Sequence, residues 1–566
     1  MPTTDYYDLG SHKHPITTQS VDAQLWFDRG LIWSYAFNYE EAARCFKKAV
    51  EADPCCAIAH WGVAYAVGPH YNKQWDKFDE IERRQVLRDA YDSAKTALKN
   101  IKNASEVEAG LIHAIVKRHP SNQPPQDYGV WNDAYADAMR NVYQKHPHDY
   151  DVCTLFVDAM MNRTPWTLWD LHTGEPTTGS NTLEAIAVVE TAMREISDAG
   201  EPEHPGLLHV YIHLQEMSPE PELALRAADS LRNLAPEASH LRHMPTHIYA
   251  QCGHYHDVVQ ANHEAILSDR KFMAREGIMN FQSLSRAHNL HFKLYGAMFL
   301  GASKAALDAA QELWETIPEQ LLRVESPPMA DWLEGYVAMK IHAPIRFGKW
   351  HEIIEEPLPK DRSLYCTTTA LLHYGKGLAH AVLGSISEAE KQQEAFHYAV
   401  QQVPITRTVF NNTCQDILAI ANRMLAGELE YRKENFESAF KHLRAAVNMA
   451  DVLPYDEPWG WMQPPRHALG ALLLEQGQVE EAEQVYKADL GLDQTLIRAC
   501  KHPDNVWSLH GYHECLLRKG EDREATMIRP RLNIALARAD VPIKASCLCR
   551  LECSSEARPH RVSHPQ

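Results

Sequence analysis

The chain has 566 residues, of which 45% are hydrophobic and 23% charged, and its formal net charge is −19. This composition favours folded structure over extensive disorder, and the length is too great for one ordinary core. The acidic balance, without any basic stripe interleaved with aromatic residues, excludes nucleic acid as an expected partner. No apolar run is long enough to cross a bilayer, and the first 20 residues lack a secretory signal. We therefore expect a cytoplasmic protein without a membrane partner.

Residues 1–20 are predicted to form an N-terminal extension that precedes a helical hairpin. The hairpin is read from the stretch LWFDRGLIWSYAFNYEEAARCFKKAVEADP. Its Trp, Gly, Ala, Phe and Pro residues have the spacing of a tetratricopeptide repeat, a helical hairpin of 34 residues: Trp26, Gly30, Trp33, Ala42, Phe46 and Pro54. The next unit in this frame begins at Ala57.

The repeat register is poor between about residues 72 and 200, where Pro- and Gly-rich stretches predict irregular insertions between helices. Beyond residue 200 the Gly and Pro residues that mark the turns and ends of repeat units return, and the repeat continues to residue 545. No stretch shows sustained alternation of apolar and polar residues, so few or no strands are expected. The sequence thus predicts an all-α fold, a right-handed α-solenoid over residues 21–545, followed by a disordered tail at 546–566.

Histidines concentrate in three consecutive units of this frame. His209 and His213 each lie 34 residues before His243 and His247. In tetratricopeptide repeats, which these units resemble, the second, fifth, ninth and twelfth positions of each unit face the concave wall of the superhelix. The residues at such positions are His209, His213, Glu216, His240, His243, His247, His288 and His291.

Residues three, four and seven positions apart share a helix face, so each set could converge on one ligand. Neutral imidazole is the commonest protein ligand for transition metals. We predict metal ligands at His209, His213, His243, His247 and His291. Glu216 is predicted to be a ligand or general base, and His240 and His288 are predicted to be further ligands or proton carriers. Pro245 should kink its helix or mark the start of a new one.

Weaker candidates for lining the substrate site come from neighbouring units. They are Asp158, Trp61, Tyr65, His342, Arg346 and His467. For each of these residues a structural interpretation competes with the functional one, because Trp is the expected packing residue of such repeats and charged pairs are usually solvated.

Several stretches together resemble one family of tetratricopeptide-repeat proteins from bacteria and filamentous fungi. They are LWFDRGLIWSYAFNYEEAARCF, AHWGVAYAVGPHYN, HVYIHLQEMSP, SHLRHMPTHIY, AHNLHF and QPPRHALGALLLEQGQVEEAEQVYKADL, and they span the chain from Asp8 to Cys547. The HxxxHxxE and HxxHMPxHIY signatures carry most of the resemblance. His60 and His70 depart from the family pattern. The resemblance implies the repeat fold, and its fungal members suggest a substrate like a secondary metabolite.

The leading hypothesis is a metal-dependent oxidoreductase or oxygenase that acts on a small organic substrate in the concave face. A shell dominated by histidine favours copper or iron, as one or two ions, over magnesium and calcium. Zinc or manganese at the same residues would instead support a hydrolase, lyase or isomerase. A third hypothesis is a non-catalytic adaptor that binds a peptide in the groove.

Overall fold

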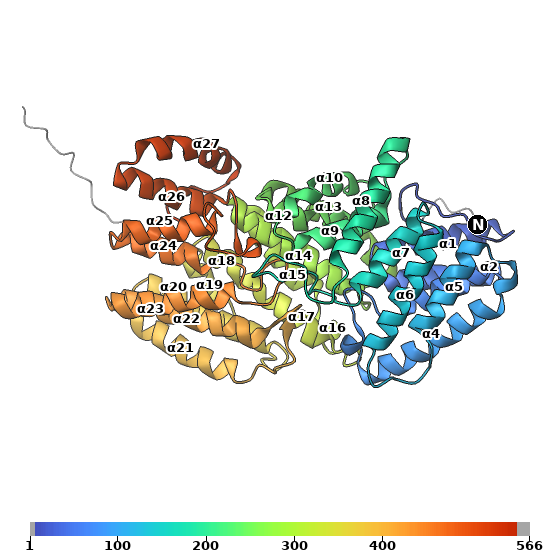
Figure 1. The fold of residues 1–566 in the computed structure, drawn as a ribbon. Helices are drawn as coiled ribbons and strands as arrows, with labels where there is room; N and C mark the ends of the chain where they lie inside the picture. The colour runs from blue at the N-terminus through green and yellow to red at the C-terminus, as the bar shows by residue number, and fades with distance from the viewer. Residues whose placement is uncertain (1–5, 552–566) are drawn as a thin grey trace, which may run out of the picture.

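The computed structural model describes residues 6–551, and these residues fold as an elongated stack of helical hairpins (Figure 1). The first helices lie at one end of the stack, the last four at the other, and α9, α12 and α14 lie between them. Within the described residues the strands are confined to one hairpin of two-residue strands, β1 (Thr408–Val409) and β2 (Asn412–Thr413). The predicted all-α solenoid is confirmed. Within the same residues, no helix is long and apolar enough to span a membrane.

The first hairpin is built from α1 (Val21–Tyr35) and α2 (Tyr39–Ala52). Ser20 caps α1 by accepting a hydrogen bond from the backbone N–H of Ala23. Gly30 permits close packing of the two helices, because a Cβ atom at this position would lie 2.7 Å from the ring of Phe46. The repeat predicted from the sequence is therefore a real helical hairpin.

Helices continue through the segment where the repeat register is poor. They are α3 (Ala57–Val67), α4 (Glu80–Lys99), α5 (Glu106–Arg118), α6 (Gly129–Lys145), α7 (Tyr150–Met161) and α8 (Thr182–Ala199). A long loop at residues 162–181 separates α7 from α8 and brings Trp166 and Trp169 to the middle of the molecule, where both pack against the two largest hydrophobic clusters.

The middle of the stack contains the histidine-rich helices. The elements are α9 (Pro205–Glu216), α10 (Leu225–Leu231), α11 (Ser239–His243), α12 (Pro245–Gln251), α13 (Tyr255–Glu276), α14 (Gln282–Leu300) and α15 (Ser303–Thr316). One hydrophobic core extends from the N-terminal end to Phe292 and a second from Met217 to the C-terminal end. The two cores meet at these helices, so groups placed here are far from bulk water.

The remaining helices complete the second core. They are α16 (Glu319–Leu322), α17 (Met329–Ala338), α18 (His342–Arg346), α19 (Trp350–Glu355), α20 (Cys366–Val382), α21 (Ile386–Val400), α22 (Cys414–Arg432), α23 (Phe436–Asp451), α24 (Pro465–Glu475), α25 (Val479–Asp489), α26 (Val506–Lys519) and α27 (Asp522–Arg538). Short 3-10 turns lie at Trp75–Lys77, Ile101–Asn103, Pro221–Ala224, Met339–Ile341 and Arg498–Cys500.

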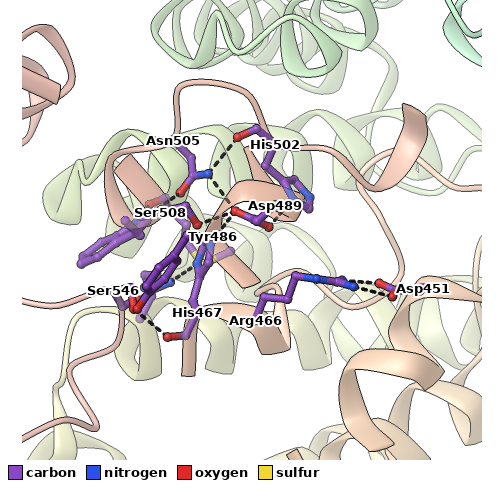
Figure 2. A network of polar contacts seen from close by, with 12 residues as sticks. Asp451, Arg466, His467, Tyr486, Asp489, His502, Asn505, Ser508 and Ser546 are labelled. Atoms are coloured by element: carbon purple, nitrogen blue, oxygen red, sulfur yellow. Dashed lines mark hydrogen bonds and ion pairs between the residues drawn. The ribbon is translucent and has the colours of Figure 1, made fainter. Parts of the chain in front are cut away.

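A buried carboxylate holds the last hairpins together (Figure 2). Asp489 accepts hydrogen bonds from Ser508 Oγ at 2.5 Å and Asn505 Nδ2 at 2.9 Å, and it pairs with the rings of His467 and His502. These partners lower the pKa of Asp489 well below its usual value although burial acts to raise it. The network thus joins α24, α25 and α26 through one satisfied buried charge.

The first residues of the predicted tail pack against the solenoid. Ser546 is buried, its hydroxyl donates to the carbonyl of His467, and it shares a hydrogen bond with the hydroxyl of Tyr486 (Figure 2). Cys547 and Cys549 form a disulfide. Instead of the expected disorder, Ser546, Cys549 and Arg550 contact Arg346, Arg432 and Glu514 of the solenoid, while Leu551 is exposed; residues 552–566 lie outside the described residues.

Candidate metal centre

The predicted histidines lie on four helices, α9, α11, α12 and α14, and we call them together the histidine centre. Prolines begin two of these helices. Pro205 is the first residue of α9, which carries His209 and His213. Pro245 is the first residue of α12, and α11 ends two residues earlier, at His243. A proline fits the first helical turn, where its missing N–H is not needed. The predicted break at Pro245 is confirmed, and it separates His240 and His243 from His247.

The first group of ligand candidates comprises His209, His213 and His240. One ring nitrogen from each lies within 4.8 Å of the corresponding atoms of the other two. In all three rings Nε2 is buried without a hydrogen-bond partner. The opposite nitrogen of His209 lies 2.5 Å from the carbonyl of Tyr35, and that of His213 lies 2.9 Å from Glu216 Oε1. Partners on Nδ1 that leave Nε2 free are typical of metal-binding histidines.

The second group comprises His243, His247 and His288. One ring nitrogen of each lies within 4.8 Å of those of the other two. Nε2 of His243 lies 2.9 Å from Nε2 of His247, and Nδ1 of His243 lies 2.7 Å from Oδ1 of Asn262. The two groups adjoin each other, since the ring centroids of His240 and His243 are 5.9 Å apart. The centre is therefore large enough to offer ligands to more than one ion.

Two carboxylates complete the centre. Nδ1 of His247 lies 2.8 Å from an oxygen of Glu216 and 2.5 Å from an oxygen of Glu457. These three buried side chains form a close charge-paired triad, and one ligand atom of each lies close enough to those of the other two to hold a metal ion. Glu216 also bonds the ring of His213 and so links both histidine groups.

Electrostatics keep most of these rings neutral. Burial lowers the pKa of His209, His240, His243 and His288 well below the usual value, and neighbouring imidazoles lower it further. Neutral imidazole is the metal-binding form.

His247 titrates differently from the other rings. Burial alone would lower its pKa, but the carboxylates of Glu457 and Glu216 raise it to about 10. For Glu216 the effects are reversed: burial alone would raise its pKa, but His213 and His247 lower it to about 2. Burial raises the pKa of Glu457, whereas His247 acts to lower it, so the protons of His247, Glu216 and Glu457 belong to the three groups together.

Aromatic rings held by strained backbone cover the centre. Phe37 lies 4.5 Å from His209, 5.5 Å from His213 and 5.3 Å from His240, measured between ring centroids. Phe37, Trp166 and Phe410 have φ values of +52°, +60° and +48°, and they are three of the five non-glycine residues with positive φ among the described residues. Such conformations cost about 1–3 kcal/mol each and cluster at functional sites.

A cavity of about 80 Å³ opens onto the centre. Its aromatic lining is Trp166, Phe281, Tyr336 and Phe410, and its polar lining is Asn72, His213, His240, His247, Ser285, His288 and Glu457. A reactant in this cavity would contact both histidine groups and Glu457. Glu216 does not line the cavity, because it lies behind the histidines that it holds.

The structure brings together seven of the eight residues predicted at the centre: Glu216, His209, His213, His240, His243, His247 and His288. The exception is His291. Its ring is buried against Tyr336 at 5.3 Å, both of its nitrogens lack partners, and it belongs to neither histidine group. The spacing of three residues from His288 on α14 is compatible with a shared face, but the ring of His291 packs against Tyr336 on α17 instead of joining the other groups.

The predicted lining residues lie outside the cavity. Trp61 stacks on Tyr65 at 5.3 Å, and the Tyr65 hydroxyl donates to Asp158 at 3.0 Å, so these three residues are core and network residues of the N-terminal half. His342 packs edge-on against Trp461. Arg346 bonds His467, whose ring is held by Asp489. The contacts of all six residues therefore support a structural role and not a role in lining the substrate site.

Sequence reasoning missed Glu457. It lies in the loop between α23 and α24, 241 residues from Glu216, at a position without any repeat register. Gln251 donates to Glu457 at 2.9 Å, and the Tyr455 hydroxyl donates to the same carboxylate. Neither the distance of Glu457 from the histidines along the sequence nor the residues beside it indicate a metal ligand.

A further histidine cluster was also missed, and it surrounds Asp151. His12, His14 and His204 lie 2.8–3.1 Å from the Asp151 carboxylate, and Tyr35 donates to it at 2.5 Å. Nδ1 of His204 accepts a hydrogen bond from the N–H of Leu207, so the proton of this ring lies on Nε2 and points at Asp151. A protonated Nε2 cannot bind a metal ion. This cluster is therefore a satisfied buried carboxylate.

Comparisons with known proteins support the repeat. A family model described as tetratricopeptide repeat matches residues 23–54, the segment of α1 and α2. No curated protein matches the chain.

Among solved structures, the chain is similar to a monomeric mutant of IFIT1 with Gppp-AAAA, at 11% identity, with 92% of this chain and 91% of that chain covered and a TM-score of 0.28. It is also similar to yeast Tom70, at 11% identity, with 88% and 96% covered and a TM-score of 0.29. The TPR domain of P58(IPK) matches at 11% identity, with 88% and 99% covered and a TM-score of 0.20. Similarity at this level says nothing about function.

Proposed function

We propose that the protein is a metal-dependent oxidoreductase that acts on a small organic substrate in the cavity beside the histidine centre. The observation that carries the proposal is the set of orphaned ligand atoms. The buried Nε2 atoms of His209, His213 and His240 have no partner, and Glu216, His247 and Glu457 bring further ligand atoms together beside them. Burying so many polar atoms without partners is costly unless an ion satisfies them.

The donor set restricts the ion. Nitrogen ligands suit copper, iron and zinc, whereas the mixed group of His247, Glu216 and Glu457 adds oxygen ligands and so favours iron or manganese over copper. Iron is the redox-active ion common to both preferences. When bound, such an ion supplies the electrons with which dioxygen is activated.

The residues of the chain have separate tasks in this scheme. Glu216 would be an oxygen ligand that also orients His213 and His247, because it contacts both rings and does not line the cavity. Glu457 lines the cavity and is the group that would accept or return a proton of the substrate. Phe37 covers three histidines and excludes water from them. The base role first predicted for Glu216 thus belongs to Glu457.

A hydrolase, lyase or isomerase that uses zinc or manganese is the second candidate. The position of Glu457 favours it, because a carboxylate beside an ion can act as the base for a coordinated water. The cavity at the histidine centre gives no support to the peptide adaptor, since about 80 Å³ is too small for a peptide.

The two chemistries differ in their response to dioxygen. Protein freed of metal would be loaded with Fe(II) in the absence of air and then exposed to air, while the visible spectrum and the dissolved oxygen are followed with ascorbate present. We expect oxygen uptake and a change in the visible spectrum, both lost in His213→Ala/His247→Ala. Tight zinc binding with an iron form inert to dioxygen would overturn the oxidoreductase in favour of the second candidate.

A further inference from the structure

A second cavity of about 70 Å³ adjoins the cavity at the centre. Six residues line both: Asn72, Trp166, Phe281, Leu284, Tyr336 and Phe410. We call this second cavity the vestibule. Its remaining lining includes the partly exposed Trp332 and the exposed Lys77, so it leads from the histidine centre toward solvent. A substrate would have to occupy or cross it.

The vestibule presents rings from segments far apart in the sequence. Trp166 meets Phe410 edge-on, with 4.7 Å between centroids, and Phe281 meets Trp332 edge-on at 5.9 Å. Phe410 lies in the two-residue turn between β1 and β2, a position where glycine and asparagine are preferred. Keeping a phenylalanine there at positive φ places its ring against Trp166. Such walls select a flat, apolar group.

Charge in the vestibule is opposite in sign to that of the whole chain. The lining contains Lys73 and Lys77 and, among the described residues, no carboxylate, although the formal net charge of the protein is −19. Nζ of Lys73 lies 4.6 Å from the ring centroid of Phe281 and 5.5 Å from that of Trp332. Lys73 is buried and pairs with Glu82, whereas Nζ of the 49% exposed Lys77 lies 3.9 Å from the exposed carboxylate of Asp76. Exposed ion pairs are weak, so an anionic group at the outer end can compete with Asp76 for Lys77.

Asn72 marks the inner end. It lines both cavities, and its Oδ1 atom is buried without a hydrogen-bond partner. A carbonyl oxygen can only accept, so it requires a donor such as a hydroxyl or amino group. The structure thus offers three successive environments: a cationic mouth, an aromatic middle and an acceptor beside the histidines.

We propose that the substrate is a small aromatic acid with one ring, a carboxylate at the end that faces Lys73 and Lys77, and a hydroxyl or amino group that donates to Asn72. The two cavities, of about 70 and 80 Å³, restrict the molecule to a single ring with short substituents. Reaction at the inner end of the bound acid, beside the histidines, rests on the proposed function. Recognition by the vestibule depends on residues that are not metal ligands.

The test is a binding titration of the metal-free protein by isothermal calorimetry with 4-hydroxyphenylacetate. Three comparison compounds each lack one feature: 4-hydroxyphenethyl alcohol lacks the carboxylate, phenylacetate lacks the donor, and 4-hydroxycyclohexylacetate lacks the aromatic ring. We expect saturable binding of the acid and at least tenfold weaker binding of each comparison compound. No binding of the acid, or equal binding of all four, would overturn the proposal.

Two variants locate the binding. Lys77→Met should weaken the acid at least fivefold without affecting the alcohol, and Trp332→Leu should weaken both compounds. Lys99→Met, an exposed lysine on α4, is the matched control and should change neither. Unchanged affinity for the acid in Lys77→Met would contradict the proposed orientation. Because the titration uses metal-free protein, a failure here leaves metal binding intact, and a protein that binds no metal could still bind the acid.

Discussion

At the scale of single residues, Glu457 carries the most specific expectation. Its carboxylate lies against His247 and faces the cavity, so Glu457→Gln removes one negative charge from the mixed group and changes little else. We expect the affinity for Fe(II) or Mn(II) to fall at least tenfold, because charged oxygen ligands dominate the binding of these ions. Competition with a fluorescent chelator measures this directly.

The control is Glu428→Gln. Glu428 is equally buried but pairs with Arg432 on α22, outside the centre. Equal metal affinity in Glu457→Gln and wild type would exclude Glu457 as a ligand.

Residues were predictable from the sequence where the repeat period placed them. The spacing placed the histidines of α9, α11 and α12 on adjacent helices, and His213 and His247, at matching positions, have ring centroids 6.2 Å apart. It did not give the detailed pairing, because His209 lies beside His240 rather than beside its match, His243. Glu457 and Phe37 come from loops that follow no period, so nothing in the sequence placed them at the centre. His291 shares the spacing but not the direction, because its ring lies against Tyr336.

At the scale of elements, the break between α11 and α12 fixes how the two histidine groups are oriented. Pro245→Ala restores a backbone N–H and lets one helix run from Ser239 to Gln251, which would turn His247 relative to His240 and His243. We expect lower metal affinity with an unchanged or higher unfolding temperature, because the continuous helix gains a hydrogen bond.

Pro465→Ala offers a matched comparison, since Pro465 is also the first residue of a helix, α24. Calorimetric unfolding and chelator competition on both variants test the idea. Wild-type metal affinity in Pro245→Ala would show that the break does not orient the ligands.

Helices were predictable as elements because their apolar spacing and caps are local features. The loop at residues 162–181 and the segment that carries Glu457 were predictable only as interruptions. Their paths depend on contacts with distant helices. The indole of Trp169, for example, donates to the carbonyl of Leu214 on α9 at 2.7 Å, a contact that no local pattern encodes.

At the scale of the whole molecule, the Asp151 cluster ties the N-terminal segment to the solenoid and makes that attachment sensitive to pH. Burial alone would lower the pKa of His14, but Asp151 raises it from 6.5 to about 9. A raised folded-state pKa contributes stability that is fully present below pH 6.5 and is lost as the pH rises through about 9.

The unfolding temperature of the wild type should therefore fall more steeply between pH 7 and pH 10 than that of His14→Gln, as measured by scanning calorimetry. His148→Gln replaces an exposed histidine that pairs with Glu195 and should follow the wild type. Parallel curves for wild type and His14→Gln would contradict the role of His14.

The overall architecture was predictable as a solenoid, but the meeting of its two cores was not. The curvature of a repeat stack comes from small rotations that accumulate over many units. Packing of residues 546–550 against the solenoid likewise depends on contacts such as that of Ser546 with Tyr486. Sequence periodicity does not contain such distances.

Metal content tests the central claim most directly. Protein produced without an affinity His-tag would be analysed by mass spectrometry of its elements, as wild type, as His213→Ala/His247→Ala, and as His351→Ala/His397→Ala, in which both replaced histidines are exposed. We predict one or two transition-metal ions per chain in the wild type and in the exposed-histidine control, and loss of at least one ion in the centre variant. Folded wild-type protein without bound metal, or a centre variant with the full wild-type content, would contradict the account.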